Sequence, residues 1–338
     1  MVTSMRIIVD GFGGDNAPLA VLQGCEMAVK EYDVELIVTG DEKILKKTAE
    51  ENNISLEKIT LYHAPDVISM EDDPFSILKE KSNCSMAVAI NLLKDGEGDA
   101  FVSAGSTGAI VIGANFILKR IKGIKRAGLA TVIPAIKGHF LLMDSGANLD
   151  CKPETLTSFG IMGSIYMNKV MGIESPRVGL VNIGTEETKG RELQIGAFEL
   201  LKNAPLNFVG NVEARDIPAG AVDVVVADGF TGNIILKLTE GLASMFAKKI
   251  KGMFLEGITG RLSAVMMIKK IKNFKKSMDY TEQGGAPLLG VKKPVIKAHG
   301  SSNPKAFKNA IRQANIFAQQ KLIEEIENTV LQMKEIEE

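Results

Sequence analysis

The sequence lacks the markers of several common protein classes. Its 338 residues include three cysteines, Cys25, Cys84 and Cys151, which lie far apart and form no Cys-x-x-Cys pair. We therefore expect neither a disulfide framework nor a zinc site, and this cysteine usage is typical of a reducing cytoplasm. No apolar run approaches the roughly 20 residues that a membrane-spanning helix needs. We also expect no signal peptide, because a charged Asp10 follows only a short apolar run.

Neither sign of charge is in excess. The chain has 40 lysines and arginines against 41 aspartates and glutamates, which gives a formal net charge of −1. This balance provides no overall attraction to nucleic acid or to an anionic membrane, so any such binding has to come from a local patch. The share of hydrophobic residues, 45%, and of charged residues, 24%, is ordinary for a soluble globular protein.

Motifs for nucleotides, metals and hydrolytic serines are missing too. The first glycine-rich loop departs from Gly-x-Gly-x-x-Gly, because Asn16 stands at the sixth position counted from Gly11. There is no Gly-x-x-x-x-Gly-Lys-Ser/Thr, and Ser106 lies in no Gly-x-Ser-x-Gly. We therefore expect no dinucleotide cofactor, no P-loop and no nucleophile-elbow serine. The three histidines are too scattered to predict a metal site.

What the sequence does contain is a regular alternation of strand-like and helical segments. It predicts a single α/β domain over 1–338, with a mostly parallel, doubly wound sheet between two layers of helices. The predicted strands are 6–10, 35–39, 59–63, 100–103, 129–133, 140–143, 178–182, 207–209, 222–227 and 295–298. The predicted helices are 17–31, 74–81, 85–94, 107–121, 153–170, 192–202, 233–256, 261–278 and a C-terminal helix from 303–304 onward.

A short phrase, Asp-x-x-Val-x-x-Gly-x-Thr-Gly, occurs twice, at 99–108 and at 223–232. Each copy is an apolar run, then a Gly-x-Thr-Gly turn, then a helical pattern. In an open α/β sheet this junction lies at the carboxyl end of a strand, where ligands bind, and it presents free backbone N–H groups that suit an anion. The likeness is either a relic of duplication or convergence on what such turns require, and we favour convergence.

Other loops at predicted strand ends carry polar groups that suit an anion. Asp10 and its neighbours follow the first strand, where they would form a polar wall of a cleft or serve as turn and cap residues. Asn233 adds a neutral donor beyond the second copy of the phrase, and Lys189 brings a cation to another loop, although a solvated charge run also explains it. His299 lies between a strand and a helix, so it is a candidate acid, base or phosphate ligand as well as a structural residue.

These loops together resemble one family. The blocks that carry the likeness are 9–18, 103–109, 144–148, 182–190, 210–216, 227–233, 284–290 and 296–302. In this order they resemble the bacterial phosphate acyltransferases (PlsX), with Phe12 at a position where methionine is expected in many members.

The resemblance implies an activity and its partners. The reaction would convert an acyl-[acyl carrier protein] and inorganic phosphate into an acyl phosphate and free carrier protein, and the product would feed glycerol-3-phosphate acylation in phospholipid synthesis. No cofactor is implied, since the phosphopantetheine arm enters with the carrier protein. The fold would be related to phosphotransacetylase and to the isocitrate and isopropylmalate dehydrogenases. A cytoplasmic homodimer associated with the inner face of the cell membrane is implied as well, with the glycerol-3-phosphate acyltransferase that uses the product as a further partner.

If phosphate itself attacks the thioester, the chain needs no nucleophile of its own. The protein then has to hold phosphate, stabilise the oxyanion and help the thiolate leave. We assign catalytic roles to Lys189, Asn233, His299 and Asp228, the last as an orienting partner of the histidine. Substrate- or phosphate-binding roles go to Asp10, Asp15, Asn16, Ser103, Gly105, Ser106, Thr107, Gly108, Asn148, Gly229, Thr231, Gly232 and Ser301.

The segment 240–280 is unlike the rest of the chain. Between 248 and 278 it has nine lysines and arginines against one acid, Glu256, interleaved with apolar residues, and glycines near 257–260 interrupt it. This predicts a protruding helical hairpin whose apolar tip, with Ile258, Leu262, Val265 and Met266, contacts an anionic membrane. Docking of the acidic carrier protein and packing between subunits remain as alternatives for the same pattern.

Three rivals to this function stay open. The first is a phosphotransacetylase-like enzyme that acts on coenzyme A thioesters. The second is a dehydrogenase on a related fold, which the missing nucleotide fingerprint disfavours. The third is a non-catalytic scaffold on a lipid surface, which would have the hairpin but no phosphate-dependent thioester cleavage.

Overall fold

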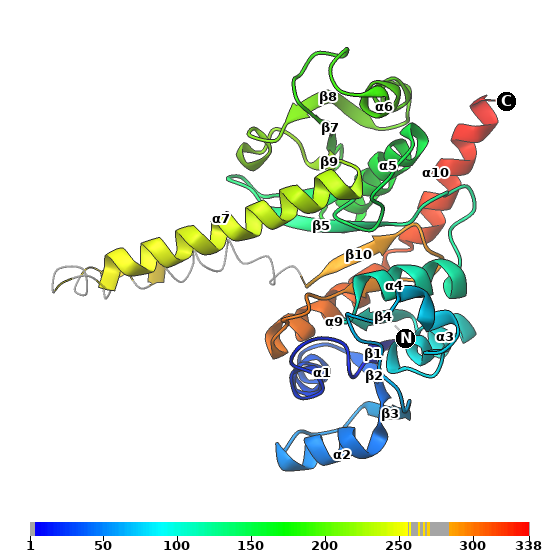
Figure 1. Ribbon diagram of the computed structural model, residues 1–338, viewed down its shortest axis with the longest axis vertical. Helices are drawn as coiled ribbons and strands as arrows, with labels where there is room; N and C mark the ends of the chain where they lie inside the picture. The colour runs from blue at the N-terminus through cyan, green and yellow to red at the C-terminus, as the bar shows by residue number, and fades with distance from the viewer. Residues whose placement is uncertain are drawn as a thin grey trace.

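The computed structural model shows a mixed sheet between two helical layers (Figure 1). It describes residues 4–255 and 284–337 with isolated positions 257, 263, 266, 267, 269 and 270 between them. Over this part of the chain the strands follow the order β3-β2-β1-β4-β11-β10-β5-β6-β9-β7-β8. The pairings are parallel except for those of β10 and the pairing of β5 with β6. The predicted fold class is therefore confirmed.

The strands and helices alternate along most of the chain. The strands are β1 (Met5–Asp10), β2 (Val34–Gly40), β3 (Ile59–His63), β4 (Ala100–Ser103), β5 (Gly128–Pro134), β6 (His139–Met143), β7 (Arg177–Asn182), β8 (Asn207–Glu213), β9 (Val224–Val226), β10 (Ala286–Leu289) and β11 (Val295–Lys297). The helices are α1 (Leu19–Glu31), α2 (Glu42–Glu51), α3 (Ser85–Asp95), α4 (Thr107–Gly113), α5 (Pro153–Lys169), α6 (Glu192–Lys202), α7 (Gly229–Leu255), α9 (Pro304–Gln319) and α10 (Leu322–Glu337), with a short 3-10 helix η1 (Pro74–Leu78).

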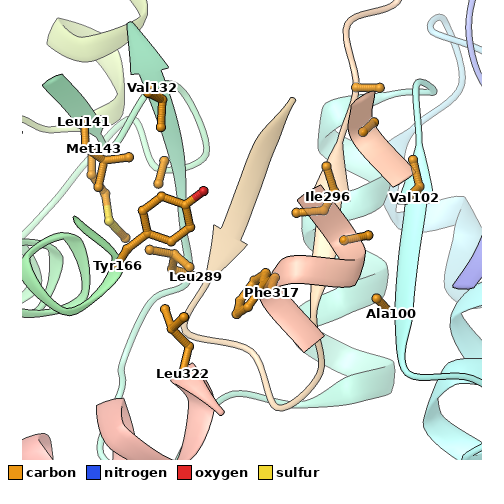
Figure 2. Close-up of a cluster of buried hydrophobic side chains, with 14 of the residues drawn as sticks. Ala100, Val102, Val132, Leu141, Met143, Tyr166, Leu289, Ile296, Phe317 and Leu322 are labelled. Carbon is orange, nitrogen blue, oxygen red and sulfur yellow. The ribbon is translucent and has the colours of Figure 1, made fainter. Parts of the chain in front are cut away.

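Alternating strand residues feed cores on the two faces of the sheet, as strand geometry requires. Ile7 and Val9 of β1 face the helices α1 and α9, while Ile8 between them faces α3 and α4. The first of these cores extends along the sheet from the strands around β1 to those around β7. Figure 2 shows Val102 of β4 and Phe317 of α9 in the same cluster as Tyr166 of α5. The Gln313 amide also donates to the buried Tyr166 hydroxyl at 2.8 Å, which joins α9 to α5.

The two copies of the phrase occupy equivalent places in the sheet. β4, which precedes the first copy's turn, lies beside β1 on the side away from β2. β9, which precedes the second turn, lies beside β7 on the side away from β8. The turn of each copy therefore follows a strand that lies beside a β-α-β unit: β4 beside β1-α1-β2, and β9 beside β7-α6-β8.

Several boundaries differ from the prediction for local reasons. β10 is an additional strand that the sequence pattern missed, because Pro287 interrupts a short run and proline is unusual inside a sheet. The helix predicted over 107–121 is α-helical only to Gly113 and continues as a π-turn over Ala114–Leu118. The C-terminal helix divides in two at Lys321, where φ is +49°. Asp41 caps α2, since its carboxylate accepts from the amides of Lys43 and Ile44.

The helix α7 is the longest described element, and Figure 1 shows it leaving the body of the molecule. Its first turns pack on the sheet through Ile235 and Leu236. Of the predicted membrane contacts, Ile258, Leu262 and Val265 lie outside the described residues, while the side chain of Met266 is 87% exposed. No helix in the described part of the chain is both long and apolar enough to cross a membrane.

Candidate active site

A cleft of about 450 Å³ lies beside the middle of the sheet. Its walls come from the loops after β1, β4, β6 and β11, from β5 and from the first turns of α7. A larger cavity of about 710 Å³ lies at the amino ends of β1, β2 and β3, where Arg6 pairs with Glu35 at 3.2 Å. Ligands of open α/β sheets bind outside the carboxyl ends of the strands, and the smaller cleft also contains several of the predicted site residues. We therefore take it as the candidate active site.

Five of the predicted residues line this cleft: Asp15, Thr107, Asn233, His299 and Ser301. Thr107 belongs to the first copy of the phrase and Asn233 directly follows the second, so one cleft receives both loops. Backbone contacts hold the other walls in place. The Asp15 amide donates to the Gly300 carbonyl at 2.8 Å. The Asn16 side chain donates to the carbonyls of Ser301 and Ser302, which fastens the loop after β1 to the loop after β11.

Asp10 does not form a wall of the cleft, contrary to expectation. Its side chain is buried, and its carboxylate accepts hydrogen bonds from the hydroxyls of Ser85 at 2.6 Å and Ser103 at 2.7 Å. Burial raises the pKa of Asp10, while these two hydrogen bonds oppose the shift. Ser103 in turn accepts from the Gly105 amide at 3.0 Å. Asp10 and Ser103 therefore support the turn from beneath. The prediction failed because a carboxylate at a strand end can point inward as well as outward.

The helix α4 begins directly above this support. Ser106 is its N-cap residue, with a long contact of 3.5 Å from the Ala109 amide, and is largely buried. Crowding favours glycine at Gly108, where a Cβ would lie 2.7 Å from the Pro74 ring, while a Cβ at Gly105 would collide only with the terminal methyl of Met86. Of this turn, Thr107 lines the cleft, at the N-terminus of α4, where free backbone N–H groups suit an anion.

The second copy has a comparable construction. The Asp228 carboxylate accepts from the Thr231 amide at 2.8 Å and the Thr231 hydroxyl at 2.9 Å, and so caps α7. This cap explains why the helix begins at Gly229 rather than at Asn233. The capping bonds engage Asp228, and the predicted pairing with His299 is replaced: the histidine Nδ1 instead lies 2.8 Å from the Ser301 hydroxyl.

The loop after β6 presses against the start of α7. Asp144 is fully buried and accepts from several backbone amides, including those of Leu129 and Asn148. The Asn148 side chain donates to the Ala127 carbonyl at 2.7 Å and to Asp144 at 2.9 Å, so it points into the protein and not toward a phosphate. Its predicted binding role stays a prediction, and this arrangement does not support it.

Close packing also explains the glycines of the second copy. A Cβ at Gly229 would lie 2.5 Å from the Asn148 carbonyl oxygen, and one at Gly232 would lie 1.9 Å from the Asp144 carbonyl oxygen. These glycines thus let α7 begin directly against the loop 144–148.

The end of β11 brings basic side chains to the cleft. The Ser301 amide donates to His299 Nδ1 at 3.2 Å, which places the proton of the neutral ring on Nε2. Burial lowers the pKa of His299, and the charges of Lys297 and Lys237 lower it further, while those of Glu240 and Asp15 oppose them. At neutral pH this histidine is therefore mainly neutral, with an N–H to donate.

Sequence reasoning missed Lys297 and Lys237. Lys297 is the last residue of β11, and Lys237 lies on α7, four residues after Asn233. Both side chains line the cleft. A lysine that ends an otherwise apolar strand was the available signal for the first. The second lies within a long helix, and only the approach of α7 to the cleft gives it significance.

Lys189 is placed differently from the other predicted catalytic residues. It follows β7, and β9 separates that strand from β6. Its ammonium lies 3.8 Å from Glu186, about half of its side chain is exposed, and it is absent from the described residues that line the cleft.

Comparison with known proteins agrees with this arrangement. The family described as "Fatty acid synthesis protein" matches residues 5–325. Two curated relatives carry the name "Phosphate acyltransferase": one from Clostridium botulinum (strain Loch Maree / Type A3) is 48% identical, covering 96% of this chain and 98% of its own, and one from Clostridioides difficile (strain 630) is 44% identical, covering 98% of each. The chain belongs to the phosphate acyltransferase family.

Solved structures of other proteins share the fold of this chain. A phosphotransacetylase from Streptococcus pyogenes has a TM-score of 0.66 at 17% identity, covering 94% of this chain and 95% of its own. A 4-hydroxythreonine-4-phosphate dehydrogenase from Klebsiella pneumoniae has a TM-score of 0.55 at 13% identity, covering 94% of this chain and 99% of its own. The predicted relation of the phosphate acyltransferase fold to phosphotransacetylase is confirmed, and a dehydrogenase has the same fold.

Proposed function

We propose that this chain transfers the acyl group of an acyl-[acyl carrier protein] to inorganic phosphate by direct attack of phosphate on the thioester. The observation that carries the proposal is a cleft that combines Lys237, Lys297 and His299 with the polar groups of Thr107 and Asn233. Such a set can bind a dianion and donate to a developing oxyanion. The family's name, phosphate acyltransferase, supports the same chemistry.

The cysteines support a mechanism without an acyl-enzyme. Cys25 and Cys84 are fully buried, and burial raises their pKa to about 12 and about 11. Burial also raises the pKa of Cys151 to about 12, with the charge of Asp144 adding to the effect. The thiolate is the nucleophilic form of cysteine, so none of the three is activated at neutral pH.

The step balances with phosphate as the nucleophile. A phosphate oxygen forms a bond to the carbonyl carbon, the carbon–sulfur bond breaks, and one proton passes from hydrogen phosphate to the departing thiolate. Asn233 and His299 line the cleft, and in this proposal Asn233 donates to the oxyanion while the Nε2–H of His299 donates to the oxyanion or to the sulfur. The Ser106–Thr107 turn would hold phosphate or the phosphopantetheine arm. Lys189 retains its proposed role as a charge-balancing residue at the neighbouring loop.

The further parts of the proposal concern assembly. An apolar stripe with a spacing of about four residues runs along exposed positions of α7: Phe230, Ile234, Leu238, Leu242 and Phe246. This stripe supports a homodimer in which α7 packs against its copy, and the mass of the protein in solution tests it.

Farther out on α7, Lys248, Lys249 and Lys251 are exposed, which supports peripheral contact of the hairpin with the anionic inner face of the cell membrane. Hand-over of the product to a glycerol-3-phosphate acyltransferase would follow at that surface.

One assay separates the proposed reaction from its nearest rival. Release of free thiol is followed from acyl-[acyl carrier protein] and from acyl-coenzyme A of the same chain length, each with and without phosphate. We expect phosphate-dependent release from the carrier-protein thioester at the higher kcat/KM. A preference for the coenzyme A thioester would favour a phosphotransacetylase-like enzyme, and release without phosphate would indicate a thioesterase.

A further inference from the structure

We propose that Lys297, at the end of β11, and Lys237, on α7, are the cation pair that holds phosphate in the cleft. The inference rests on the proposed function and assigns a part of it that the sequence did not indicate. It stands on where the two side chains lie and on the groups around them.

The position of Lys297 is unusual for a lysine. Its side chain is half-buried at the edge of the core, and its ammonium donates to the Ala298 carbonyl. Within the described residues it makes no salt bridge with a carboxylate. A desolvated ammonium with a single neutral acceptor is costly to keep charged, so an anion that enters the cleft gains more from it than from an exposed lysine.

Lys237 reaches the same cleft from a different element. It lies on α7, 62% exposed, with Glu240 of the same helix at 3.5 Å. Burial is the main cause of the lowered pKa of Lys297, and the charge of Lys237 adds to it. Two like charges that approach across a cleft repel each other, and a doubly negative ligand between them relieves that repulsion.

The surroundings leave room for a small anion. Among the described residues, the cleft next to Lys297 is lined by the small residues Gly285, Ala286, Ala298 and Gly300. The Thr131 and Ser145 hydroxyls face the same space and lie 2.8 Å apart. A phosphate in contact with both lysines would lie between β11 and α7, with Asn233 one helical turn before Lys237 on the same wall.

The charged groups around Lys297 give the pair a pH signature. Burial and, after it, the charge of Lys237 together lower the pKa of Lys297 to about 8, while Asp15 in the loop after β1 opposes them. Glu240 and His299 are the other titratable groups of the cleft. Lys297 is therefore mostly protonated at pH 7 and mostly neutral at pH 9, where inorganic phosphate remains a dianion.

The test measures the KM for phosphate and the KM for acyl-[acyl carrier protein] separately. In Lys297→Met we expect the KM for phosphate to rise about tenfold or more, the size of one charge-assisted hydrogen bond, with little change in the KM for the thioester. The matched control is Lys292→Met, an exposed lysine in the turn between β10 and β11, which should leave both values unchanged.

The pH profile distinguishes ligand binding from a structural role. In the wild type kcat/KM for phosphate should fall above pH 8, whereas Lys297→Arg, which stays charged, should keep its value to pH 9.5. Lys237→Met removes a like charge, so it should weaken phosphate binding yet shift the alkaline fall to higher pH. Because Lys237 is mostly exposed, this variant also keeps the test decisive if Lys297→Met fails to fold.

An active wild type whose KM for phosphate is unchanged in Lys297→Met and in Lys237→Met would overturn the assignment. An alkaline limb that stays in place in both Lys297→Arg and Lys237→Met would overturn it as well. A wild type without phosphate-dependent thioester cleavage would instead contradict the proposed function itself.

Discussion

The Asp10 carboxylate accepts a hydrogen bond of 2.7 Å from the Ser103 hydroxyl, and this bond links the ends of two neighbouring parallel strands. The Ser103 hydroxyl also accepts from the Gly105 amide, so it connects the Asp10 carboxylate to the turn above. The two residues serve as the foundation of the cradle, and the ligand-facing groups are the residues that follow them.

We expect Asp10→Ala to destabilise the protein. The hydroxyls of Ser85 and Ser103 would lose their acceptor in the core, at a cost of about 1–3 kcal/mol for each unsatisfied group. Asp10→Asn should cost less. Because burial raises the pKa of Asp10 in the folded state, its stabilising effect is greatest below its unfolded pKa and is lost as the pH rises through the folded value. Urea denaturation should therefore show a larger deficit of Asp10→Asn near pH 4 than near pH 7, and a deficit that grows with pH would contradict this account.

The start of α7 offers a matched pair of glycines. Gly232→Ala should lower stability by about 1–3 kcal/mol or more, because its Cβ would collide with the Asp144 carbonyl oxygen. Gly241 lies on the same helix with nothing within 4 Å of a Cβ, so Gly241→Ala should raise stability by about 1 kcal/mol through helix propensity. Thermal unfolding of both variants checks the geometry, and equal effects would mean that α7 does not press on the loop 144–148.

The catalytic assignments predict a loss of turnover without unfolding. Removing one oxyanion donor costs about 2.7–4 kcal/mol in the barrier, so Asn233→Ala should cut kcat about a hundredfold or more. The same loss is predicted for Lys189→Ala. Circular dichroism of both variants should match that of the wild type. Near-normal turnover in Lys189→Ala alone would remove that residue from the mechanism, and near-normal turnover in both would remove the whole assignment.

The hairpin prediction concerns residues beyond the described part of the chain. Leu262→Glu combined with Val265→Glu should abolish binding to vesicles that contain anionic lipid, because two charges would have to enter the apolar layer. Turnover on soluble substrates should remain largely intact. Ile136→Glu, an exposed apolar position in the β5–β6 turn, is the control and should not alter sedimentation with vesicles. Undiminished binding by the double variant would exclude the tip as the contact.

The fold was largely predictable because strand and helix periodicities alternate with little interruption. The exceptions have local causes. Pro287 concealed β10, and the Asp228 cap moved the start of α7 four residues earlier. These details depend on partners that are distant in sequence or on single capping bonds, which a periodicity does not record.

The site was predictable in position but not in side-chain direction. The sequence located the loops at the carboxyl ends of strands, and five predicted residues do line one cleft. It could not show that Asp10 and Asn148 point into the core, because a polar residue at a strand end looks the same in either orientation. The sequence also did not indicate that the Lys297 side chain is half-buried beside a cleft, because a lysine at the end of an apolar strand is usually exposed.

The central claim is that phosphate is the nucleophile and that the chain carries no acyl group. The most direct test mixes excess enzyme with acyl-[acyl carrier protein], first without and then with phosphate, and follows the intact mass of the enzyme in a single turnover. We expect no mass increase and no free carrier protein before phosphate is added, and acyl phosphate with stoichiometric free carrier protein afterwards. An acylated enzyme that forms without phosphate and is discharged by it would contradict the account.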